Sequence, residues 1–351
     1  MSVAAASHSH PRERMTVSRC RPTVSLPALV LLAVGALLLP SRPAAAQKAR
    51  DSVSLRFGWP VGMSARVDQR WSRVRRGQRA DSSALRTTYR MRVLTHPEGR
   101  LVVSDSFAFP GAPAPVGDRE AMAQRLLTQL GSLSPSYVVS AAGEFRQLVD
   151  AQKMKATVDS MLAPLLTRLE ELPPQARAML QSATSEQALA ARAAEGWNAL
   201  AGAWVGADFA VGDVYRSETN EPIPMLGGAT VPMRYEFTAV ERTSCGGGAA
   251  SPERGCVRLR MTSRPDSAGM RKVLEGMLAQ FGAKAAEAVK ALRGMTVENE
   301  IVVVAEPATL VPHFMSQTKR VRVRTAATAT EPAGATSQTD VRTAKFEYAK
   351  P

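Results

Sequence analysis

The residues best suited to catalysis are a carboxylate and an imidazole, Glu306 and His313, which flank a proline-containing turn. An imidazole that titrates near neutral pH can act as a general base, and a nearby carboxylate can orient it. A hydrolase of this kind also needs a nucleophile, and no Gly-flanked serine stands out. The sequence also lacks the common phosphate-loop, zinc-protease, dinucleotide and EF-hand motifs. We therefore predict no catalytic, cofactor-binding or metal-binding residues, and keep a periplasmic or secreted hydrolase using His313 as an alternative.

For four other acidic residues and a second histidine, a position on a solvated face or in a turn is a simpler explanation than a catalytic or metal-binding role. Glu298 and Glu300 lie two residues apart, so they share one face of an expected strand. Paired carboxylates can exchange protons or bind a cation, but these two fit the solvated side of that strand. Asp208 and Asp213 lie in an expected loop, where a β-turn explains both and no further metal ligand clusters with them. His96 begins the turn signal His-Pro-Glu-Gly of an expected hairpin.

The first 46 residues have the features of a secretory signal. Arginines precede an apolar core, Leu26–Leu39, of 14 residues. This length fits the roughly 7–15 residues of a signal and falls short of the ~20 residues of a membrane span. Small residues precede a predicted cleavage site after Ala46, and a start at Met15 would leave the signal complete. We expect a periplasmic or extracellular protein that does not span the membrane after cleavage.

Two cysteines remain after the predicted cleavage, Cys245 and Cys256. The Gly- and Pro-containing stretch between them lies between two expected strands, and export places it in an oxidising compartment. We predict a disulfide that closes this hairpin loop. A redox or metal-binding pair is the alternative, but the Cys-x-x-Cys spacing and a histidine close in sequence are absent.

The densest basic run contains six arginines around Trp71. Arginine beside an aromatic ring can bind nucleic acid or anionic lipid. The run bridges two expected strands, and Arg75-Arg76-Gly77 fits a hairpin turn, so we interpret it mainly as a solvated loop. Export argues against a nucleic-acid partner, and we favour an anionic envelope surface as the partner of this run. The arginines are Arg66, Arg70, Arg73, Arg75, Arg76 and Arg79.

The composition fits a folded protein of one large domain or two small ones. The chain has 351 residues, and 45% of them are hydrophobic, which is too many for a disordered chain. The net charge is +14, of which the first 46 residues contribute +4. The positive charge favours adhesion to anionic surfaces.

Apolar periodicity predicts strands near both ends of the chain and helices between them. Period-two alternation marks 53–59, 63–71, 85–93, 101–109, 136–148, 231–239, 257–261, 297–303, 321–323 and 346–348. Helical spacing marks 117–133, 154–170, 175–202 and 267–292, with a kink or break expected at Pro164. These elements predict an α+β fold. Its antiparallel β-sheet is curved and half-barrel-like, lies at both ends of the chain, and has helical insertions and a helical middle.

The same pattern predicts the domain organisation. A signal peptide at 1–46 precedes a β-rich N-terminal half with one helix at 47–149. A helical segment at 150–205 then leads to a β-rich C-terminal half at 206–351, which has one helix and a flexible loop at 325–339.

The function predicted from these features is a non-enzymatic binding or structural module of the cell envelope. In the sharper form, the helices at 117–133, 154–170 and 267–292 cover the sheet and enclose an apolar groove for a lipid-like ligand. Their methionine-containing apolar stripes suit flexible apolar ligands, although core packing explains the same stripes. A protein-interaction domain without a pocket is a further alternative, and the oligomeric state is left open.

The overall pattern resembles uncharacterised, signal-bearing bacterial envelope proteins of similar length. The features that carry the resemblance are the exported N-terminus, the run Tyr137–Phe145 and the segment Glu306–Pro312. The resemblance implies a secreted, β-rich protein and no particular activity.

Overall fold

The fold is known from a computed structural model of the chain. The described residues are 51–77, 80–110, 134–168, 178, 181–222, 230–245, 255–279, 291–327 and 333–348. All of them belong to one compact unit, Ala49–Pro351. The predicted signal peptide at 1–46 and the predicted helix at 117–133 lie outside the described residues.

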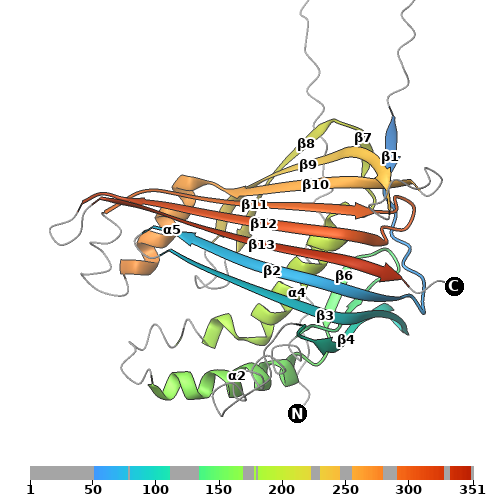
Figure 1. The fold of residues 1–351 in the computed structure, drawn as a ribbon, viewed down its shortest axis with the longest axis horizontal. Helices are drawn as coiled ribbons and strands as arrows, with labels where there is room; N and C mark the ends of the chain where they lie inside the picture. Colours follow the sequence, from blue (N-terminus) through green and yellow to red (C-terminus); the bar gives the residue numbers. More distant parts are fainter. Residues whose placement is uncertain are drawn as a thin grey trace, which may run out of the picture. The chain divides into compact units, whose positions relative to one another are not determined.

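Eleven antiparallel strands form one sheet, in the order β6-β5-β4-β3-β2-β13-β12-β11-β10-β9-β8 (Figure 1). A separate two-stranded sheet pairs β1 (Ser52–Ser54) with β7 (Asp208–Ala210). The strands of the large sheet are β2 (Ser64–Arg76), β3 (Asp81–His96), β4 (Gly99–Ala108), β5 (Tyr137–Val139), β6 (Phe145–Leu148), β8 (Val214–Pro222), β9 (Thr230–Ser244), β10 (Gly255–Pro265), β11 (Leu292–Ala305), β12 (Pro312–Thr325) and β13 (Gly334–Tyr348).

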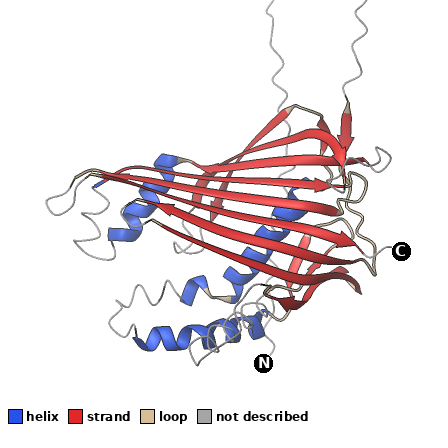
Figure 2. Ribbon diagram, in the orientation of Figure 1, coloured by secondary structure: helices blue, strands red, loops and turns tan. Residues whose placement is uncertain are grey.

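The helices of the described residues lie on one side of this sheet (Figure 2). They are α2 (Ala151–Arg168), α4 (Glu186–Leu200) and α5 (Ser267–Ala279), and a 3-10 turn, η1 (Gly202–Trp204), follows α4. Ser185 caps α4, since its hydroxyl accepts a hydrogen bond from the backbone N–H of Ala188 at 3.2 Å. The helix α2 runs through Pro164, where the sequence predicts a kink or a break.

The predicted α+β fold, with sheets at the two ends of the chain and a helical middle, is wrong. The protein is mainly β. Its two β-rich parts form one sheet, because the last strand, β13, pairs with β2 and joins them. Period-two alternation specifies which residues share a face, but it does not specify the partner strand. Residues 334–339, part of the predicted flexible loop at 325–339, are the first residues of β13.

The hairpin of β3 and β4 forms where the turn signal predicts it, and a glycine is required there. Gly99 has a φ of +144°, and a Cβ at this position would lie 2.2 Å from the carbonyl oxygen of Val139 on β5. Only glycine allows this backbone conformation together with so close an approach of the next strand.

The core lies at one end of the sheet, between the sheet and the segment that contains α4 and η1. We call the side of the sheet that faces this core the inner face. Trp59, Trp197 and Trp204 are at most 1% exposed there. The indole N–H of Trp59 donates to the carbonyl of Leu310 at 2.8 Å, and that of Trp197 donates to the carbonyl of Gly143 at 2.9 Å. The strands contribute Ala65, Val67, Met91, Ala239, Leu259, Val303, Met315, Ala344 and Phe346 to the same core.

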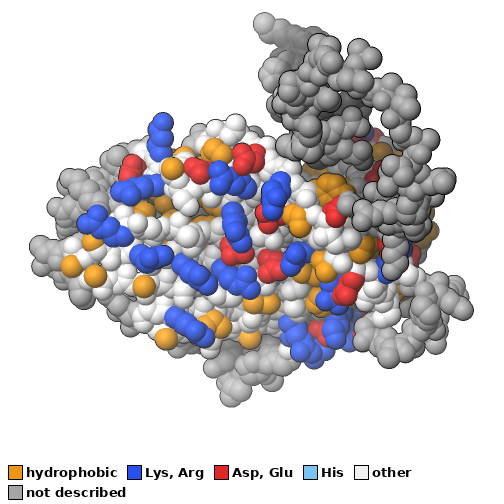
Figure 3. Space-filling model, turned by 90° about the horizontal axis from the view of Figure 1, so that it is seen from above, with side chains coloured by type: hydrophobic (Ala, Val, Ile, Leu, Met, Phe, Trp, Pro, Cys, Tyr) orange, Lys and Arg blue, Asp and Glu red, His pale blue; other side chains and the backbone are white. Residues whose placement is uncertain are grey.

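The opposite side, the outer face, carries the alternate residues and is highly charged (Figure 3). Arginine–carboxylate pairs link neighbouring strands, as between Arg86 and Asp68 at 2.6 Å and between Arg216 and Glu236 at 2.9 Å. The charges are therefore on the side of each strand away from the core, as period two requires.

Candidate functional site

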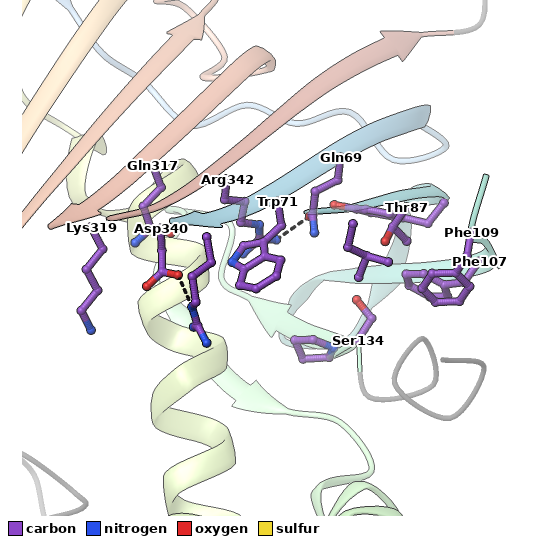
Figure 4. Close-up of a pocket in the computed structure, with 14 residues that line it drawn as sticks. Gln69, Trp71, Thr87, Phe107, Phe109, Ser134, Gln317, Lys319, Asp340 and Arg342 are labelled. Atoms are coloured by element: carbon purple, nitrogen blue, oxygen red, sulfur yellow. Dashed lines mark hydrogen bonds and ion pairs between the residues drawn. The ribbon is translucent and has the colours of Figure 1, made fainter. Parts of the chain in front are cut away.

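A cavity of about 650 Å³ lies on the inner face beyond the core. One wall is the sheet itself, and Figure 4 shows Trp71 of β2, Arg342 of β13 and Gln317 of β12 beside one another there. Along β2 the inner positions change from Ala65 and Val67 in the core to Gln69, Trp71 and Arg73 at the cavity. Ligand pockets in proteins ordinarily measure roughly 300–1,000 Å³. The cavity is therefore large enough for a small ligand or for part of a larger one.

Aromatic and aliphatic side chains make up one side of the cavity. Tyr89 and Phe107 stack with their ring centroids 5.2 Å apart, and Leu85, Trp71 and Phe109 extend this surface. Trp71 is only half-buried, unlike the three tryptophans of the core. Rings at the surface of a cavity can contact an apolar ligand without first leaving a packed core.

A β-bulge directs two of these rings into the cavity. Asp105, on the outer face of β4, forms an ion pair with Arg92. The register then shifts, and Ser106 adopts a φ of 58°. The extra residue of the bulge reverses the alternation of side chains between the two faces. Phe107 and Phe109 therefore line the cavity on the inner face, although regular alternation would place them on the outer face with Asp105. A non-glycine residue at positive φ costs free energy, and such residues occur preferentially at functional sites.

Polar residues line the cavity toward β13 and β12. The Arg342 guanidinium donates from Nη2 to Oε1 of Gln69 at 2.7 Å. Gln317, directly opposite Arg342 on β12, donates to Oδ1 of Asn299 at 3.0 Å. These side chains are on the inner face at the cavity, whereas the same strands carry apolar residues on that face at the core end. The cavity thus has an aromatic side and a polar side.

Asp340 is the acidic residue among those that line the cavity. Its Oδ1 accepts from Nε of Arg73 at 2.6 Å, and its Oδ2 accepts from Gln338 at 2.6 Å. Burial raises the pKa of the Asp340 carboxyl, but these two hydrogen bonds and the positive charges of Arg73 and Lys319 outweigh burial and hold the pKa below its usual value. Asp340 is thus a carboxylate at neutral pH and neutralises Arg73.

A second hollow of about 560 Å³ lies next to the first along the same strands. Val321 and Val323 of β12 line it together with Gln338, whose amide donates to Asp340 of the first cavity. The two hollows therefore lie side by side on the inner face of β12 and β13.

Glu306 and His313, the pair considered for the alternative hydrolase, lie elsewhere, at the core end of the sheet. Nε2 of His313 is 3.2 Å from Oε1 of Glu306, and Oε2 of Glu306 accepts from the Thr309 hydroxyl at 2.9 Å. The imidazole also packs against the ring of Tyr348 at 5.3 Å. Among the described residues no serine or threonine hydroxyl is hydrogen-bonded to His313, so the pair has an orienting carboxylate and no nucleophile.

Cys245 and Cys256 form a disulfide with an S–S distance of 2.00 Å, at the position the sequence predicts. No histidine is close to these two cysteines in sequence. The structure brings His313 from β12 to within 4.8 Å of both sulfur atoms. Metals bind the thiolate form of cysteine, and sulfur atoms that are bonded to each other are not thiolates.

The remaining acidic pairs and His96 do not meet at one site. Glu298 and Glu300 are on the outer face, where they pair with arginines at 2.9 and 3.5 Å. Asp208 pairs with an arginine at 3.2 Å, and Asp213 lies in the turn that follows β7. His96 is the last residue of β3, and its Nδ1 accepts from the backbone N–H of Glu98 in the turn at 3.2 Å.

The arginine run is divided between the two faces of one strand, which its interpretation as a loop did not foresee. Arg66, Arg70 and Arg76 occupy outer positions of β2, whereas Arg73 lies on the inner face and stacks over Trp71 at 5.0 Å. Arg75 also lies on the inner side, in the second hollow, and Arg79 lies outside the described residues. The signal that could have located the cavity is the alternation itself, because Trp71 and Arg73 continue the pattern of Val67.

Comparison with known proteins adds little to this geometry. No family model and no curated protein matches the chain. A solved structure of lipovitellin, concerned with lipid–protein interactions in that protein, is similar over 82% of this chain, with 8% sequence identity and a TM-score of 0.38. The chain spans about a quarter of the lipovitellin chain, since the match covers 25% of it. No described helix is both long and apolar enough to cross a membrane.

Proposed function

We propose that this protein is an exported, non-enzymatic binding module of the cell envelope that holds a lipid-like, amphipathic ligand on its inner face. The observation that carries the proposal is the cavity between the aromatic side, which includes Trp71 and Tyr89, and the polar side around Arg342. An alkyl chain gains free energy when it leaves water for an apolar surface, and a polar headgroup needs hydrogen-bond partners once it is buried. The cavity offers both kinds of surface.

A hydrolase is less well supported. Its predicted base, His313, has a partner in Glu306, but the residues that line the cavity include neither of them. A general base must lie within hydrogen-bond reach of the proton that it removes. A ligand in the cavity would therefore not reach this imidazole.

Localisation in the periplasm or outside the cell is part of the same proposal and rests on the predicted signal at 1–46. The outer face supports contact with an anionic envelope surface. Exposed arginines such as Arg66, Arg322 and Arg324 have no ion-pair partner there among the described residues. Such cations attract anionic headgroups and are screened by salt.

The first test of ligand binding uses the half-buried tryptophan. The full chain is expressed in an exporting bacterial host, purified, and titrated with a fatty acid brominated on its alkyl chain. Bromine quenches indole fluorescence at contact range. Since Trp59, Trp197 and Trp204 are buried in the core, we expect partial, saturable quenching of Trp71 that the Trp71→Phe variant loses. Quenching that persists unchanged in Trp71→Phe would place the ligand elsewhere.

A matched pair of variants tests whether the cavity itself is the site. Leu85 lines the cavity, whereas its neighbour Ala84 is an exposed residue on the outer face of β3. Leu85→Trp fills part of the cavity and is expected to weaken binding at least about tenfold, while Ala84→Trp leaves it unchanged. Equal effects of the two variants, or no saturable binding by the native chain, would contradict the proposal.

A further inference from the structure

The cavity contains more positive than negative charge. The residues that line it include three cations, Arg73, Lys319 and Arg342, and one carboxylate, Asp340. Asp340 is already hydrogen-bonded to Arg73 at 2.6 Å. Lys319 and Arg342 have no ion-pair partner among the described residues, so the cavity has two cations that its own acid does not neutralise.

Among the described residues, no carboxylate is paired with Arg342. Its Nη2 donates to the neutral amide of Gln69, and its Nε is buried with no hydrogen-bond partner in the described part of the chain. A buried N–H of a charged group costs free energy when it has no acceptor, and an anion beside the guanidinium offsets the cost of burying the charge. The sheet fixes this arginine, because on β13 it lies between Trp71 of β2 and Gln317 of β12.

Lys319 extends the positive region along β12. It lies opposite Asp340, close enough for its charge to influence that carboxyl, and its own side chain is exposed. An oxyanion that is bound to Arg342 can therefore reach a second, exposed cation without displacing the hydrogen bond between Arg73 and Asp340.

The apolar groups lie on both sides of these cations. Tyr89, Phe107 and Leu85 are on the β3 and β4 side, and Val321 and Val323 of the second hollow are on the β12 side. We propose that the ligand is an anionic amphiphile whose headgroup oxyanion, a carboxylate or a phosphate, is bound by Arg342 and Lys319 while its alkyl chain lies against the adjacent apolar residues. This inference rests on the proposed function and specifies the ligand class.

The test compares headgroups on one alkyl chain. Oleic acid and its neutral ethanolamide form one pair, and oleoyl lysophosphatidylglycerol and oleoyl lysophosphatidylcholine form the other. Affinities for the full chain are measured by calorimetry below the critical micelle concentrations. Hydrogen bonds between charged groups are roughly twice as strong as neutral ones. We therefore expect each anionic ligand, or the one whose oxyanion fits, to bind at least about tenfold more tightly than its uncharged or zwitterionic partner.

Variants locate the headgroup. Lys319→Gln is expected to weaken binding of the anionic ligand about fivefold or more and to leave the neutral ligand unaffected. Arg342→Gln is expected to have the larger effect, and its thermal unfolding shows whether it still folds. Lys319 is exposed, so we expect Lys319→Gln to fold, and this variant tests the proposal even where Arg342→Gln does not fold. The control is Arg216→Gln on the outer face of β8, where Arg216 is exposed and paired with Glu236 at 2.9 Å, and it is expected to change neither affinity.

The outcomes separate this inference from the proposed function. Preference for one anionic pair alone supports the inference and identifies the oxyanion as a carboxylate or a phosphate. Equal binding of the anionic and uncharged ligands, or equal effects of Lys319→Gln and Arg216→Gln, overturns the anionic headgroup and leaves the apolar cavity intact. Failure of every amphiphile to bind the native chain overturns the proposed function itself.

Discussion

The two ends of the inner face differ although the same strands run through both. At the core end, β2, β13 and β12 place Val67, Phe346 and Met315 inward, and the tryptophans of α4 and η1 cover them. A few residues along, the same strands place Gln69 and Arg342 inward, and a cavity lies beside them. Alternation therefore decides which side chains point inward, and the covering elements decide whether those side chains form a core or line a site.

The largest expected effect tests the core end. Trp197→Ala removes a fully buried ring that packs on Trp59 with a centroid distance of 5.1 Å. We expect a loss of about 3–5 kcal/mol in the free energy of unfolding, measured by urea denaturation. The matched variant at the other end, Trp71→Ala, removes a half-buried ring and is expected to cost about 1 kcal/mol or less while it abolishes ligand quenching. Similar losses for the two variants would remove the distinction between the ends.

An intermediate effect is expected from the disulfide, which belongs to the core end. Cys256 is completely buried and pairs with Thr243, next to Val257 in the core. Reduction of the Cys245–Cys256 bond, which links residues 11 apart, is expected to lower the free energy of unfolding by about 2–3 kcal/mol. Thermal unfolding with and without a phosphine reductant measures this. Ligand affinity should not change, because the cavity is at the other end; a parallel loss of affinity would show that the ends are coupled.

The smallest effect concerns the charge inside the cavity. The folded-state pKa of Asp340 is lower than its usual value of 3.8, so its ion pair with Arg73 stabilises the folded protein above that pH. The stabilisation is lost as the pH falls through the folded-state pKa. Asp340→Asn should therefore destabilise the protein at pH 7, by about 1 kcal/mol or less, and by a smaller amount near pH 3. Urea denaturation at both pH values measures the difference, and an equal effect at the two values would argue against the ion pair.

Much of the strand content could be predicted from the sequence. The alternation in β2, β3, β9 and β10 is visible because one face is apolar and the other is charged. The turn at His96 and the Gly-rich stretch between the two cysteines also identify their hairpins. The beginning of β13 was missed because its residues are small and polar, and its strand structure depends on hydrogen bonds to β12 and β2.

The candidate site was harder to predict for a related reason. Trp71 and Arg73 occur within a run of arginines, so composition suggested a solvated loop. In the sequence, Phe107 and Phe109 continue the alternation of Leu101 and Val103. The bulge at Ser106 places them on the other face of the sheet from these two residues. Arg342 is 273 residues from Gln69 along the chain and meets it only through the pairing of β13 with β2.

The sequence by itself determined the local features of this protein: the period of its strands, the charge of its outer face and the cysteine pair that closes a hairpin. These depend on residues that are close along the chain, so their pattern can be read directly. Only the tertiary structure decided that the two β-rich parts form one sheet, that His313 lies beside the disulfide, and that Arg342 meets Gln69 and the aromatic residues. Those contacts join distant segments, and strand pairing depends on backbone hydrogen bonds that every residue type except proline can form in full.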